Sequence, residues 1–139
     1  MGILNIILVE DNEDHFFLIE EVFKHAQLKV NLHRVRNGFE LMTYLHKNVL
    51  LPDLILLDLN MPRKGGRAVL QELKATPKYQ HIPIVILTTS RYDNDRTECE
   101  KLGAEAFISK PTSFDDFVTV IKLAIAPYLH SNGRKSLSS

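Results

Sequence analysis

Asp58 stands where a side chain is well placed to do chemistry, directly after the apolar run Leu54–Leu57. This run of Leu and Ile is bounded by Pro52 and Pro62, a pattern typical of a short strand buried on both faces. A carboxylate after such a strand must lie at its end, where solvent or a cation reaches it, because an unpaired buried charge is strongly destabilising. The alternative interpretation is an Asp that only caps a turn.

Further polar side chains follow other apolar runs in the same way. These are Glu10 and Asp11 after residues 3–9, Asn60 two positions beyond Asp58, Thr88 after residues 82–87, and Lys110 after residues 106–109. If the runs are parallel strands, their carboxyl ends lie along one edge of a sheet, and open parallel sheets bind ligands at that edge. The pattern therefore predicts one pocket that contains carboxylates, a hydroxyl and an ammonium group.

The predicted pocket suits phosphoryl chemistry. Its clustered carboxylates repel one another and need a cation, and a ligand set made only of oxygens suits Mg²⁺. Lys110 and Thr88 then serve as donors to an anion beside the metal, and Asp58 as the nucleophile that forms an aspartyl phosphate. Taken alone, Lys110 would be a solvated surface lysine, but its place between a strand end and Pro111 argues against that interpretation.

The elements that must position these residues alternate along the chain. Strands are expected at Ile3–Val9, Val30–Val35, Leu54–Leu57, Ile82–Leu87 and Ala106–Ser109, the second of them weaker because His33 and Arg34 interrupt it. Helical spacing of apolar residues follows each strand. Five strands that alternate with five helices predict a single doubly wound, flavodoxin-like α/β domain with a parallel sheet. The domain is expected to cover residues 1–129, and residues 130–139, rich in Ser, Asn and Gly, to form a flexible tail.

Local signals place the helix ends. Asp11 or Asn12 is expected to cap the first helix, Asn37 the second, Asp93 or Asp95 the fourth, and Ser113 the last, with Asp116 completing a capping box. Gly103 after Leu102 is a C-terminal signal for the fourth helix.

Composition limits the classes of function. Lys plus Arg and Asp plus Glu number 17 each in 139 residues, which gives no support for a nucleic-acid or membrane partner. One cysteine, Cys99, cannot form an intramolecular disulfide. The chain shows no secretory signal and no apolar stretch of about 20 residues, so a cytoplasmic location is expected.

In this order the motifs resemble the receiver domain of two-component response regulators, over about residues 3–129. The family has an acidic pair after the first strand, an Asp after the third, Thr or Ser after the fourth and Lys-Pro after the fifth. The chain has Glu10-Asp11, Asp58, Thr88 and Lys110-Pro111 at these places, with Met61-Pro62 and Gly66 also fitting. Glu10 departs from the more common Asp but keeps a ligand oxygen. A narrower resemblance, to stand-alone receivers of the cyanobacterial phytochrome type, rests on residues 9–12, 57–62 and 87–90.

The resemblance implies roles for individual residues. Asp58 would accept a phosphoryl group from a sensor histidine kinase, in the narrower resemblance a phytochrome-type photoreceptor kinase. Asp11, Asp58 and the main-chain carbonyl of Asn60 would hold Mg²⁺, with Glu10 acting through water. Thr88 would bind the phosphoryl group together with Lys110.

Signal output follows from the same resemblance. Thr88 and Phe107 would form a switch, although Phe107 alone could be a plain core residue. The protein would be a signalling module rather than an enzyme. Because only residues 130–139 follow the predicted domain, output is expected through a downstream protein or a homodimer.

Other interpretations fit less well. A receiver that acts as an interaction module without phosphorylation is the main alternative, but every key position is filled. A haloacid-dehalogenase-type phosphatase also uses a nucleophilic Asp, yet it needs the nucleophile after the first strand and a second Asp where this chain has Asn60. No Gly-rich turn follows the first strand, which argues against a dinucleotide site, and the histidine spacing argues against zinc.

Overall fold

Predominantly apolar segments form most of the strands, and the segments between them form the helices. The computed structural model describes residues 3–59, 61 and 65–138, the last of these, 130–138, by backbone alone. Within this part of the chain the strands are β1 (Leu4–Val9), β2 (Val30–Val35), β3 (Leu54–Leu57), β4 (Ile84–Thr88) and β5 (Ala106–Ser109). The helices are α1 (Glu13–Ala26), α2 (Gly38–Lys47), α3 (Gly66–Ala75), α4 (Asp93–Lys101) and α5 (Phe114–Ser138).

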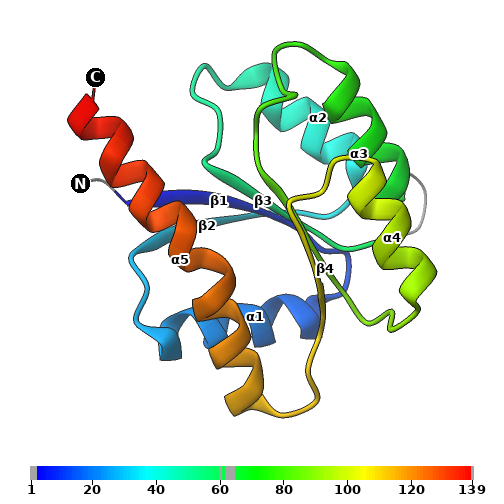
Figure 1. Ribbon diagram of the computed structural model, residues 1–139, viewed down its shortest axis with the longest axis vertical. Coiled ribbons are helices and arrows are strands. Elements are labelled where there is room, and N and C mark those ends of the chain that lie inside the picture. The colour runs from blue at the N-terminus through cyan, green and yellow to red at the C-terminus, as the bar shows by residue number, and fades with distance from the viewer. Residues whose placement is uncertain (1–2, 60, 62–64, 139) are drawn as a thin grey trace.

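The strands form one parallel sheet in the order β2-β1-β3-β4-β5. Helices α1 and α5 cover one face of the sheet, and α2, α3 and α4 cover the other (Figure 1). The prediction of a doubly wound parallel α/β domain is therefore confirmed. All side chains of β3 and β4 are buried, as the uninterrupted apolar runs predict for strands covered on both faces.

Two apolar clusters, one on each face, hold the layers together. On one face Ile19, Val22 and Phe23 of α1 and Phe117, Ile121 and Ile125 of α5 pack on alternate residues of the central strands. On the other face the buried residues of α2 and α3, among them Leu41, Leu45, Val69, Leu70 and Leu73, pack with Ile7, Ile55, Ile86 and Phe107. Because adjacent strand residues point to opposite faces, each strand contributes to both clusters.

Most of the predicted caps are present. Asn12 Oδ1 accepts from the His15 amide at 2.9 Å, Asn37 Oδ1 from the Glu40 amide at 3.0 Å, and Ser113 Oγ from the Asp116 amide at 3.2 Å. Gly103 follows α4 with φ of +106°, a conformation that favours glycine.

The predicted cap of α4 is wrong. Tyr92 occupies the N-cap position, and no side chain caps this end, whereas Asp93 and Asp95 lie inside the first turn. Asp95 is instead bonded to Ser90 and Arg67. The Asp95 carboxylate, which the local sequence assigns to the helix end, therefore bonds these two side chains instead.

The C-terminal helix continues past the predicted domain boundary. The bounds of α5 include residues 130–138, so the division into a domain ending at Leu129 and a flexible tail stays a prediction. None of the described helices combines the length and apolarity needed to cross a bilayer.

Candidate functional site

The main chain brings the ends of β1 and β3 to the same level. Val9 is in register with Leu57, so the residues that follow each of them, Glu10 and Asp58, leave the sheet side by side. The Asp58 amide donates to the Val9 carbonyl at 3.2 Å, and the Glu10 amide donates to the Val35 carbonyl at 3.0 Å. These bonds fix both acidic residues at the carboxyl edge of the sheet.

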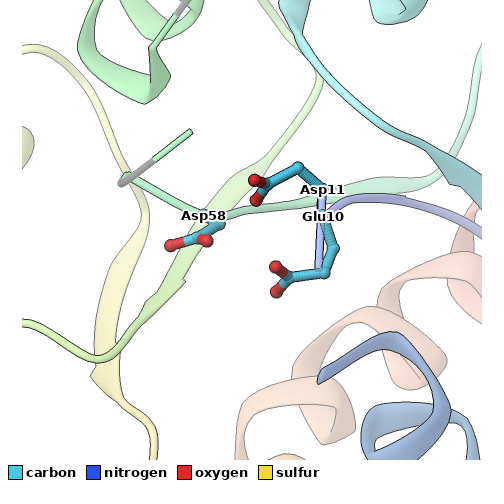
Figure 2. A group of neighbouring side chains, drawn as sticks. All are labelled: Glu10, Asp11 and Asp58. Carbon is cyan, nitrogen blue, oxygen red and sulfur yellow. The ribbon is translucent and has the colours of Figure 1, made fainter. Parts of the chain in front are cut away.

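Three carboxylates gather at this edge. Glu10, Asp11 and Asp58 each offer an oxygen, and these oxygens lie within 4.8 Å of one another (Figure 2). Glu10 and Asp58 are almost completely buried, at 1% and 6% exposure, whereas Asp11 is more open. So close a group of hard oxygen donors fits a small divalent cation, which would also relieve the repulsion between the carboxylates.

Lys110 follows β5, the last strand of the sheet, and its side chain extends to the group of carboxylates. Its Nζ donates to Glu10 Oε1 at 2.8 Å and lies 3.1 Å from His15 Nδ1. Lys110 is 8% exposed, and its amide donates to the Thr88 carbonyl at 2.7 Å, which ties this residue to the end of β4. Sequence reasoning did not identify His15, whose only signal was its place in the first helical turn.

Burial and the neighbouring Lys110 shift the pKa of Glu10 in opposite directions. Removal of the carboxylate from water raises the pKa of Glu10 above its ordinary value, and the nearby charge of Asp58 also raises it. The hydrogen bond and the positive charge of Lys110 oppose this rise. The direction is upward, so Glu10 holds a proton more readily than an exposed glutamate.

Arg34 supports the acidic loop and was missed by the sequence analysis, which treated it as an interruption of β2. Its guanidinium donates from Nε to the Glu10 carbonyl at 3.0 Å and from Nη2 to the Asp11 carbonyl at 3.2 Å. It also pairs with Glu13, lowering the pKa of that exposed carboxyl, and lies 4.9 Å from the ring centroid of Phe16. The available signal for Arg34 was a cationic side chain on an edge strand beside the acidic loop that follows β1.

Thr88 and Phe107 lie on one face of the sheet. Phe107 is in register with Ile86, and Thr88 is two residues beyond Ile86, so the two side chains are diagonal neighbours. Thr88 is fully buried, and its Oγ1 accepts from the Ser90 amide at 3.4 Å. The Phe107 ring is 5% exposed, with the Arg96 guanidinium carbon 5.1 Å from its centroid.

The loop after Asp58 is described only in part. Asn60, predicted as a metal ligand through its carbonyl, lies outside the described residues, as does Pro62. Met61 is buried, and Gly66 begins α3 against the Asp58 main chain. A Cβ at Gly66 would lie 2.6 Å from the Asp58 carbonyl oxygen, so only glycine allows this approach.

Comparisons with known proteins agree with the geometry. The family model of the response regulator receiver domain matches residues 6–122. Response regulator Rcp1 of Synechocystis is 35% identical over 122 residues, which cover 84% of this chain and 83% of Rcp1.

Two solved structures are similar in fold and sequence. The crystal structure of the phosphorylated cyanobacterial phytochrome response regulator RcpA has a TM-score of 0.84 and 35% identity, and the match covers 94% of this chain and 96% of RcpA. The Mn²⁺-bound form of Rcp1 has a TM-score of 0.78 and 34% identity, with 88% of this chain and 92% of that chain covered.

Proposed function

The chain belongs to the response regulator receiver family, and we propose that it accepts a phosphoryl group on Asp58 from a sensor histidine kinase. Receiver domains of this family are signalling modules of two-component systems and are phosphorylated as a rule. The observation that carries the assignment to Asp58 is its place in the group formed with Glu10, Asp11 and Lys110 at the carboxyl edge of the sheet. Among these, Asp58 follows the central strand β3.

Mg²⁺ is the proposed cofactor. Asp11 and Asp58 would hold it directly, together with the Asn60 carbonyl that the family pattern assigns, and Glu10 would act through water. The bound ion supplies positive charge for the phosphoryl oxygens. The Mn²⁺-bound structure of Rcp1 supports a divalent ion in the family.

The chain's own residues have separate roles in the proposed transfer. An Asp58 oxygen attacks phosphorus, a new O–P bond forms, and the P–N bond of the phosphohistidine breaks as the imidazole leaves with the electron pair. Lys110 brings a second positive charge into the same group of carboxylates. Thr88 is the proposed hydroxyl ligand of the phosphoryl group, and Phe107 beside it is the proposed aromatic partner of the switch.

The partners of the protein are also proposals. The similarity to RcpA and Rcp1 supports a phytochrome-type photoreceptor kinase as the donor. Output would pass to a downstream protein or through a homodimer, in the cytoplasm and without nucleic acid or membrane. Phosphotransfer from a panel of the host's histidine kinases, each autophosphorylated first, would identify the donor by the fastest transfer.

Labelling with a small phosphodonor tests the function. With Mg²⁺ and acetyl phosphate, the intact mass of the protein is expected to rise by one phosphoryl group, and Asp58→Asn should abolish the rise. Asp53→Asn is a matched control, since Asp53 lies at the opposite edge and bonds the Asn5 amide. Undiminished labelling of Asp58→Asn would overturn the assignment. A wild-type protein that is never labelled would favour a receiver that works without phosphorylation.

A further inference from the structure

The first turn of α3 is attached to the main chain of the phosphorylatable residue. Gly66 approaches Asp58 so closely that a Cβ would overlap the Asp58 carbonyl, and the Gly66 amide donates to the Leu59 carbonyl at 3.2 Å. The next residue along the helix is Arg67. Its position is therefore set by the backbone that carries Asp58.

Arg67 reaches from α3 to α4. Its Nη2 donates to Asp95 Oδ1 and its Nε donates to Glu98 Oε1, across 28 and 31 residues of sequence. The side chains of Arg67 and Asp95 are 39% and 24% exposed, so this charge-assisted contact is partly shielded from water. The guanidinium joins the two helices at the end nearest the site.

Asp95 continues the contact toward Thr88. While its Oδ1 accepts from Arg67, its Oδ2 accepts from the Ser90 hydroxyl. The Ser90 amide in turn donates to Thr88 Oγ1 at 3.4 Å, and the Ser90 carbonyl accepts from the Ser109 hydroxyl at 2.8 Å. Ser90 is thus held from both sides, by Asp95 and by β5, in the position from which it contacts the Thr88 hydroxyl.

We propose that Arg67, Asp95 and Ser90 form a positioning chain that sets the Thr88 hydroxyl relative to Asp58. The positioning chain begins at the backbone of Asp58, which Gly66 contacts, and ends at Thr88 in the same pocket. It rests on the proposed role of Asp58 and Thr88 in phosphoryl transfer and extends it to three residues outside the acidic group. Arg67, Asp95 and Ser90 act through Thr88 and do not touch the reacting atoms.

Preorganisation explains why such a chain affects the reaction. Because the loop between β4 and α4 is already ordered, the Thr88 hydroxyl turns to the phosphoryl group without the cost of ordering that loop. The links from Arg67 through Asp95 to Ser90 are in series, so loss of one link removes the constraint that reaches Ser90 from α3 as fully as loss of two. Arg67→Gln, Asp95→Asn and Ser90→Ala should then have similar effects, and a double variant should be no worse than a single one.

The experiment compares phosphorylation rates by acetyl phosphate and half-saturating concentrations of beryllofluoride, a phosphoryl mimic, followed by NMR. We expect Arg67→Gln, Asp95→Asn and Ser90→Ala each to slow labelling and weaken beryllofluoride binding about three- to tenfold. Arg67→Lys, which keeps a cation for Asp95, should recover part of the loss. Glu98→Gln is the matched control. It weakens the other contact of Arg67 but leaves the bonds from Arg67 to Asp95 and from Asp95 to Ser90 in place.

The outcomes separate positioning from stability. Equal losses in Glu98→Gln and Asp95→Asn, a wild-type rate in Ser90→Ala, or a loss in Arg67→Gln/Ser90→Ala equal to the product of the single losses would each overturn the chain. Urea midpoints of every variant show whether the folded population is the same. If wild type is labelled and the variants match it, only the positioning chain fails, whereas an unlabelled wild type contradicts the proposed function itself.

Discussion

Lys110 Nζ lies 2.8 Å from Glu10 Oε1, although 100 residues separate the two in sequence. Glu10 follows β1 and Lys110 follows β5, and the order of the sheet places β3 and β4 between them. The ion pair therefore crosses the ends of the two central strands, next to Asp58. Both partners are buried, so each depends on the other for compensation of its charge.

Removal of the Lys110 charge should destabilise the protein. Lys110→Met keeps the apolar stem but leaves Glu10 without its cation beside Asp58, and breaking a buried pair in this way typically costs about 3 kcal/mol. We expect the free energy of unfolding, from urea denaturation without divalent ions, to fall by that order. Glu10→Gln/Lys110→Met should recover part of the loss, because no unpaired charge remains. A double variant less stable than Lys110→Met would contradict the pairing.

The raised pKa of Glu10 gives the pH dependence of stability a definite sign. Because burial raises the pKa of folded Glu10 above its unfolded value, against the effect of Lys110, the native state binds more protons between the two values. This contribution to the free energy of unfolding is fully present below about pH 4.3, the ordinary value for Glu, and is lost as pH rises through the raised pKa.

Comparison with Glu10→Gln isolates that contribution. Other groups titrate in both proteins, so the difference in unfolding free energy between wild type and Glu10→Gln, measured with a chelator present, reports Glu10 alone. We expect the wild type to lose stability relative to the variant as pH increases above the ordinary Glu value. A difference that is independent of pH would contradict the raised pKa.

Mg²⁺ should stabilise the protein through the carboxylate group. An ion that binds only the folded state adds about 1.4 kcal/mol at ten times its Kd, and here it also relieves repulsion between Glu10, Asp11 and Asp58. Thermal melting with and without Mg²⁺ should show a rise in Tm that Asp11→Asn largely removes. Asp14→Asn is the matched control, since Asp14 is an exposed acid in the first turn of α1 outside the group. Equal rises in both variants would argue against the site.

The sequence predicts best what local chemistry decides. The apolar run of β3 and the caps Asn37 and Ser113 depend on neighbours within a few residues, and the structure has them where the pattern places them. The strand β4 begins two residues later than expected and includes Thr88. Topology then brings Glu10, Asp11 and Asp58 together, since the ends of parallel strands meet at one edge.

Long-range partners could not be predicted in the same way. Asp95 carries a good capping signal, but its carboxylate bonds Ser90 and Arg67 instead, and Arg67 becomes its neighbour only after α3 packs beside α4. Arg34 interrupts the apolar pattern of β2, and its value lies in contacts with the carbonyls of the loop after β1. Lys110 was expected beside a bound anion, whereas its bond to Glu10 joins residues 100 positions apart in sequence.

Signal output is expected to pass through Phe107. The resemblance implies that Phe107 forms a switch with Thr88, and we expect its ring to turn inward when a phosphoryl group draws the Thr88 hydroxyl. In the structure the ring is buried, on the same face of the sheet as Thr88 and under the Arg96 guanidinium of α4. A change at Thr88 therefore reaches α4 and β5 through packed neighbours, and the surface formed by α4, β5 and α5 is where we expect a homodimer.

Sedimentation velocity with and without beryllofluoride tests this route. The wild type should shift toward twice its mass on saturation. Phe107→Ala should bind the mimic yet show a much smaller shift, because the ring that packs between Thr88 and Arg96 of α4 is lost. Phe39→Ala is the control, since Phe39 is 54% exposed on α2, outside the proposed surface. If Phe107→Ala dimerises as the wild type does, the ring is not the link. If wild type keeps its mass while the Phe107 resonances change, output passes to a different partner protein.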